Sequence, residues 1–71
     1  MRRDCVTQVI VLWESGEWDN FATPLEAQMY INSMIDELGV PVQAWLEDMR
    51  GNKKWDYEIV ENDGGLIELV D

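Results

Sequence analysis

The stretch TPLEAQMYINSMIDELG, residues 23–39, decides the fold of this chain. Thr23 is a residue type that caps helices with its side-chain oxygen, Pro24 fits the first helical position, and Glu26 completes a capping box. Gly39 is a typical residue at which a helix ends. The stretch therefore predicts a helix from Pro24 to Leu38.

The apolar residues of this helix recur at helical spacing and form one stripe, which we expect to pack on a sheet. They are Ala27, Tyr30, Ile31, Met34, Ile35 and Leu38. Polar residues take the opposite side and are expected to face solvent. They are Glu26, Asn32, Ser33, Asp36 and Glu37.

The segment before the helix predicts a β-hairpin. Residues 6–14 are rich in β-branched and apolar side chains, Ser15-Gly16 indicates a two-residue turn, and residues 17–21 form the return strand. With this turn Trp13 lies opposite Trp18, a favourable aromatic pair. It also sets two acidic residues of the turn, Glu14 and Glu17, against each other.

The segment after the helix predicts two further hairpins. Residues 42–49 and 54–61 are joined at Gly51-Asn52, and a loop over residues 63–65 leads to a last strand over residues 66–71. The sequence thus predicts an α+β fold, with a single helix packed on an antiparallel sheet in the order ββαβββ. All 71 residues form one compact domain in this prediction.

The composition excludes several classes of function. The chain has 15 Asp and Glu against 5 Lys and Arg, a formal charge of −10, so phosphates and anionic membranes would repel it. Yet 46% of the residues are hydrophobic, too many for an acidic disordered tail. Cys5 is the only cysteine, and there is no histidine, so we expect no disulfide, metal or cofactor. A homodimer is then the expected source of extra stability.

The N-terminus superficially looks like a signal peptide, because Arg2 and Arg3 precede an apolar run. Asp4 interrupts this pattern, and no small-residue cleavage site follows. We therefore expect a cytoplasmic protein.

The charges are segregated along the chain, since the bases occur only at residues 2–3 and 50–54. With the turn at Gly51-Asn52, Leu46 faces Tyr57 and Glu47 lies opposite Asp56. The loop over residues 63–65 sets Ile59 opposite Leu69 on the core face and Glu68 beside Val60 on the outer face. The outer face of the predicted sheet then carries an acidic stripe of Glu47, Asp56, Glu58 and Glu68, with Trp45, Val60 and Val70 among them.

Two interpretations of this stripe remain open. Acidic faces commonly serve solubility alone. A mixture of carboxylates and exposed apolar groups is instead typical of a contact surface. The candidate partner-binding residues are Glu47, Asp56, Glu58, Glu68, Glu14, Glu17, Asp19 and Trp45. The other three tryptophans, Trp13, Trp18 and Trp55, are expected in the core.

Enzymatic activity is not expected. The chain has no histidine for general-base chemistry and no nucleophile-elbow or P-loop motif, and Cys5 has no imidazole partner. A calcium loop at residues 62–65 lacks the ligand spacing of an EF-hand, and turn chemistry explains those residues.

In size, net charge, acidic stripe (Glu47, Asp56, Glu58, Glu68) and compact α+β layout, the chain resembles the small phage-encoded acidic DNA-mimic proteins. Among them it is most similar in general character to the dimeric inhibitors of the bacterial nucleoid protein HU. The resemblance extends over the whole chain but carries no residue's role across. It implies an inhibitor that occupies the cationic DNA-binding surface of a host protein during phage takeover. An immunity or antitoxin-type inhibitor of a basic nuclease, and a structural acidic subunit, remain as alternatives.

Overall fold

The computed structural model describes residues 7–70, so the interpretations of Arg2, Arg3 and Cys5 lie outside the described residues. The elements follow in the order β1 (Thr7–Leu12), β2 (Trp18–Phe21), α1 (Pro24–Leu38), β3 (Gln43–Asp48), β4 (Lys53–Glu61) and β5 (Ile67–Val70). This confirms the predicted α+β class and element order. Within residues 7–70, no helix combines the length and apolar character needed to cross a membrane.

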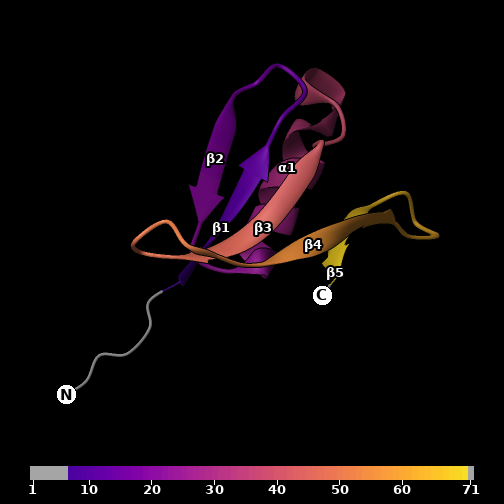
Figure 1. The fold of residues 1–71 in the computed structure, drawn as a ribbon. Helices are drawn as coiled ribbons and strands as arrows, with labels where there is room; N and C mark the ends of the chain where they lie inside the picture. The colour runs from indigo at the N-terminus through magenta and orange to yellow at the C-terminus, as the bar shows by residue number, and fades with distance from the viewer. Residues whose placement is uncertain (1–6, 71) are drawn as a thin grey trace.

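The five strands form one antiparallel sheet in the order β2-β1-β3-β4-β5, and α1 covers one face of it (Figure 1). The long strand β4 pairs through its first part with β3 and through its last residues with β5. In Figure 1 the helix lies behind the sheet, so the viewer looks at the face that α1 leaves open.

The predicted helix is confirmed from Pro24 to Leu38. The side chain of Thr23 accepts a hydrogen bond from the N–H of Glu26, at 3.2 Å, as an N-cap does. At the other end Gly39 adopts a φ of +79° and its N–H binds the carbonyl of Ile35. A residue with a Cβ would be strained in this conformation, which explains why the helix ends at a glycine.

The core lies between α1 and the sheet. From the helix, Ala27 and Ile31 are fully buried. From the strands, alternate residues point at them, as the period of a half-covered sheet requires. These are Val9, Val11, Ala44, Leu46, Tyr57, Ile67 and Leu69, and Trp13, which follows β1, joins them.

The first hairpin differs from the prediction, because its loop contains three residues and not two. Trp13 N–H binds the carbonyl of Glu17 and Gly16 N–H binds the carbonyl of Trp13, so Leu12 pairs with Trp18. Gly16 alone takes a positive φ, of +94°, whereas a two-residue turn ending in Gly would demand one at Ser15 as well. A one-residue shift turns every side chain of the return strand over. Trp18 therefore lies on the face opposite Trp13 and is 61% exposed, so its assignment to the core is wrong.

The second hairpin also closes through a three-residue loop. Asp48 N–H binds the carbonyl of Asn52, while the Asp48 carboxylate accepts the N–H groups of Arg50 and Asn52, both at 2.9 Å. The Asn52 N–H is the main cause that holds the pKa of Asp48 below its usual value. This side-chain cap favours the three-residue loop, residues 49–51, in place of the predicted two-residue turn at Gly51-Asn52.

A β-bulge in β4 then returns its side chains to the predicted faces of the sheet. The register is Leu46 with Trp55 but Glu47 with Lys53, so Lys54 is the extra residue. The predicted pairs Leu46–Tyr57 and Glu47–Asp56 are therefore wrong, and Trp45 faces Asp56 instead. Because the net shift is even, the carboxylates of β4 still lie on the predicted side of the sheet.

The third hairpin matches the prediction. Ile59 pairs with Leu69 and Val60 with Glu68 across a loop over residues 63–65. The side chain of Asn62 accepts the N–H groups of Gly64 and Leu66, which repeats the cap that Asp48 supplies in the second hairpin.

The outer edge of β5 is closed by two helix side chains. Asn32 accepts the N–H of Ile67 at 2.8 Å and donates to the carbonyl of Ile67 at 3.1 Å. Gln28 accepts the N–H of Leu69 at 2.8 Å. The prediction that Asn32 faces solvent is wrong, because its amide takes the place of a neighbouring strand. An unpaired strand edge invites pairing with other chains, so these bonds also protect the edge of β5.

Candidate protein-binding face

The face of the sheet that α1 does not cover, called the outer face below, holds most of the predicted site. Its side chains come from alternate positions of all five strands. They are Gln8, Ile10, Leu12, Trp18, Asn20, Gln43, Trp45, Glu47, Lys53, Asp56, Glu58, Val60, Glu68 and Val70.

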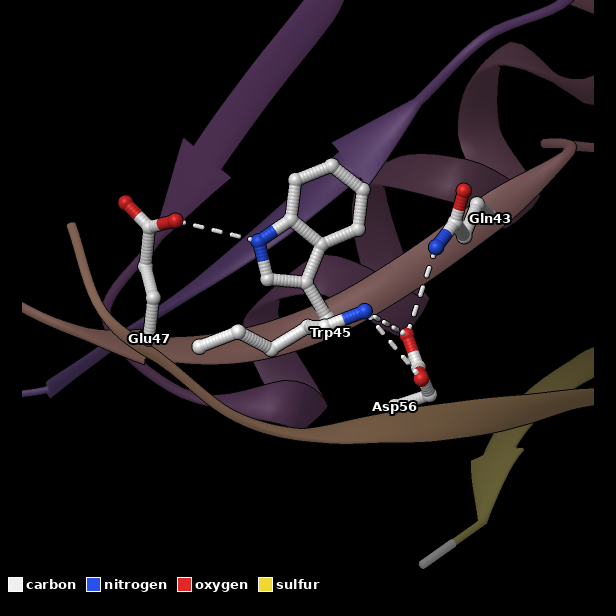
Figure 2. A network of polar contacts seen from close by, with 5 residues as sticks. Gln43, Trp45, Glu47 and Asp56 are labelled. Atoms are coloured by element: carbon white, nitrogen blue, oxygen red, sulfur yellow. Dashed lines mark hydrogen bonds and ion pairs between the residues drawn. The ribbon is translucent and has the colours of Figure 1, made fainter.

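Glu47 and Trp45 are joined by a hydrogen bond on this face (Figure 2). The indole Nε1 of Trp45 donates to Glu47 at 3.0 Å, and Gln8 donates to the other carboxylate oxygen at 3.1 Å. Asn20 in turn donates to Gln8 at 2.8 Å. This chain of hydrogen bonds spans β2, β1 and β3. It orients the Glu47 carboxylate relative to the Trp45 ring.

Asp56 forms a second cluster beside Trp45. The ammonium of Lys53 binds its carboxylate at 3.1 Å, and Gln43 donates to it at 3.3 Å (Figure 2). The hydrogen bond from Lys53 is the main cause that holds the pKa of Asp56 below its usual value. The Lys53 ammonium also lies 5.9 Å from the centre of the Trp45 ring, a cation–π arrangement. Lys53 is thus a base inside the predicted acidic stripe.

Glu58 and Glu68 complete the stripe on β4 and β5. Both are exposed on the outer face, and Glu68 accepts a hydrogen bond from Asn62 at 2.7 Å. Four carboxylates and the one ammonium of Lys53 leave a net charge of −3 on the outer face. The four carboxylates of the acidic stripe therefore lie on one face of the sheet, and Lys53 pairs with one of them, Asp56.

The three carboxylates near the first hairpin do not share one place. Glu14 and Glu17 lie exposed in and beside the β1–β2 loop. Asp19 lies on the helix side of β2, where it accepts the indole N–H of the buried Trp13 at 2.9 Å. This bond satisfies a buried donor, so Asp19 serves the core and we remove it from the candidate contact residues.

Two tryptophans shape a shallow apolar groove on the outer face. Trp18 and Trp45 line it together with Ile10, Leu12 and Glu47, around a hollow of about 320 Å³. Ile10 is only 4% exposed, although it points away from the core. We call this hollow the tryptophan groove. The sequence did not indicate this groove, because the expected two-residue turn placed Trp18 on the opposite face.

The prediction that Trp55 lies in the core is wrong. It is on the helix side of the sheet, next to Tyr57, but is 47% exposed. The helix packs chiefly on β5, β2 and β1, so it leaves the first half of β4 open.

The described bases gather at one end of the molecule. Arg50, Lys53 and Lys54 lie in or next to the β3–β4 loop, whereas carboxylates are spread over the other elements. In residues 7–70 no cluster of three or more metal-ligating side chains occurs. The chemistry this face offers is electrostatic attraction of cations combined with aromatic contact.

Comparison with protein-family models, with curated proteins and with solved structures finds no match to this chain.

Proposed function

We propose that this protein is a DNA-mimicking inhibitor, whose outer face binds the cationic DNA-binding surface of a host nucleoid-associated protein of the HU type and blocks DNA binding. The observation that carries the proposal is the row of carboxylates on one open sheet face, with Glu58 and Glu68 exposed. A face with a net negative charge steers a cationic partner into contact and disfavours DNA itself.

The arrangement of the other groups supports the same proposal. Glu47 and Asp56 are held by hydrogen bonds from neighbouring side chains, so little ordering entropy would be lost on binding. Arg50 and Lys54 lie at the loop end, away from Glu58 and Glu68 at the β5 side. In this proposal the chain catalyses no reaction and acts in the host cytoplasm, at the nucleoid.

The test is a competition between this protein and duplex DNA for purified HU, followed by the anisotropy of labelled DNA. We expect displacement of the DNA at stoichiometric protein, and an affinity for HU that falls steeply as salt rises. A ternary complex, with HU bound to DNA and to this protein at once, would contradict mimicry. Inhibition of a basic nuclease with no effect on HU would favour the antitoxin alternative.

We also propose a homodimer, formed where exposed apolar side chains gather and charges are few. A hollow of about 440 Å³ between α1 and β5 is lined by the exposed side chains of Leu25, Met29 and Leu66, and Glu68 is the one charged residue that lines it. Two copies that each carry −10 repel least at such a surface.

For the dimer we expect sedimentation equilibrium at micromolar concentration to give twice the 8.3 kDa mass of one chain. Met29→Glu should give the mass of one chain, because it buries a charge in the apolar contact. Met49→Glu is the matched control, since Met49 is equally exposed but lies in the β3–β4 loop. A wild-type protein that sediments as a single chain would exclude the dimer.

A further inference from the structure

From the tryptophan groove we infer that this protein takes one arginine side chain of its partner, with the guanidinium between Trp18 and Trp45 and directed at the Glu47 carboxylate. This inference rests on the proposed function, because it names the group that a basic partner inserts. It differs from that function in assigning a specific pocket and not a diffuse acidic face.

The lining of the tryptophan groove is mostly apolar, with one charged residue. Four of the five lining residues are apolar or aromatic, and the fifth is Glu47. Such a groove suits a side chain with an aliphatic stem and a cationic head. Arginine fits best, because its planar guanidinium stacks on aromatic rings and its fork of donors matches a carboxylate.

The Glu47 carboxylate can accept further hydrogen bonds. Its two oxygens accept one hydrogen bond each, from Trp45 and from Gln8. An ionised carboxylate offers about four acceptor sites, so each oxygen has room for a further donor. The two existing bonds orient the carboxylate without neutralising its charge.

The ring of Trp45 already has a cation near it, because the Lys53 ammonium lies 5.9 Å from the ring centre. Lys53 lines a separate hollow with Gln43 and Gly51, on which Trp45 and Glu47 also border. It does not line the tryptophan groove, and neither do Arg50 and Lys54. Among the described bases, therefore, none supplies a cation to the side of Trp45 that faces Trp18. A second copy of this chain is a poor occupant, because two chains that each carry −10 repel each other at an acidic face.

The test uses two peptides, acetyl-Gly-Arg-Gly-amide and its neutral counterpart with citrulline in place of arginine. The indole N–H signals of isotopically labelled protein are followed by NMR during titration. We expect the arginine peptide to shift the Trp18 and Trp45 signals in a saturable way, and the citrulline peptide to leave them in place. Trp18→Ala should weaken arginine-peptide binding roughly tenfold, as expected for loss of a partly shielded cation–π contact.

Trp55→Ala is the matched control, because Trp55 is also an exposed tryptophan but lies on the other side of the sheet. It should leave peptide binding unchanged. Equal shifts with citrulline, or equal effects of the two alanine variants, would overturn the inference.

The two proposals fail separately. If Trp18→Ala still displaces DNA from HU as well as the wild type does, the inference about the groove is wrong and the inhibitor function stands. If the arginine peptide binds as expected but HU is never inhibited, the groove stands and the DNA-mimic function is wrong.

Discussion

Asn32→Ala should lower the free energy of unfolding by about 3 kcal/mol. The side chain of Asn32 satisfies both the N–H and the carbonyl of Ile67 at the edge of β5. Alanine leaves two partly buried backbone groups without partners, and each such group costs roughly 1–3 kcal/mol. For a domain of this size that is a large share of a total stability of about 4–11 kcal/mol. Urea unfolding followed by tryptophan fluorescence measures the loss.

The loss should also be local. Hydrogen exchange of the Ile67 amide should accelerate in Asn32→Ala more than exchange of the amides between β1 and β3. Ser33→Ala is the control: Ser33 is the next helix residue, and its hydroxyl binds only the exposed carbonyl of Tyr30. We expect less than about 0.5 kcal/mol for this variant. Equal destabilisation by the two variants would mean that the amide of Asn32 does not hold β5.

The double variant Glu58→Lys, Glu68→Lys should weaken binding to HU about 100-fold. Each reversal replaces an attraction with a repulsion at an exposed position of the outer face. Close charge pairs across interfaces contribute about 1.5–7 kcal/mol, and a total of about 3 kcal/mol corresponds to that factor. Glu47 and Asp56 are left unchanged because their hydrogen bonds also order the face. The competition assay with labelled DNA measures the effect.

The matched control is Asp36→Lys, Glu37→Lys, which changes the net charge equally but on the exposed side of the helix. Both positions lie in the last part of α1, where cations interact favourably with the helix dipole, so this variant should fold at least as well. It should retain HU binding within a few-fold. If both double variants lost affinity alike, net charge alone would govern binding, and the pattern on the outer face would be irrelevant. Sedimentation of both variants checks that the oligomeric state is unchanged.

Local signals were sufficient to predict the helix and the last hairpin. Thr23, Pro24 and Gly39 act through their own backbone preferences, and the structure uses them as the sequence indicates. The loop over residues 63–65 could also be predicted, because a glycine at its last position fits a three-residue hairpin loop. The same rule, applied to Gly16 and Gly51, would have predicted the first two loops correctly.

The faces of β4 depended on two deviations that partly offset each other. The wider loop after Asp48 and the bulge at Lys54 together shift the register by an even number of residues, so Asp56 and Glu58 remain on the outer face. No local propensity marks Lys54 as a bulge. The acidic stripe was thus predicted on the right face from a wrong register. In the first hairpin a single shift had no such compensation, and Trp18 changed sides.

By itself the sequence determined the class of fold, the helix with its two ends, and the abundance of carboxylates, because these follow from side-chain chemistry and short-range backbone preferences. Only the tertiary structure decided which groups meet. Pairing across strands set Trp18, Trp45 and Glu47 around one groove, and helix packing turned Asn32 from a presumed surface residue into the partner of Ile67. The physical reason is that a one-residue change in strand register reverses every side chain, and the register of β4 also depends on a bulge at Lys54 that no local preference marks.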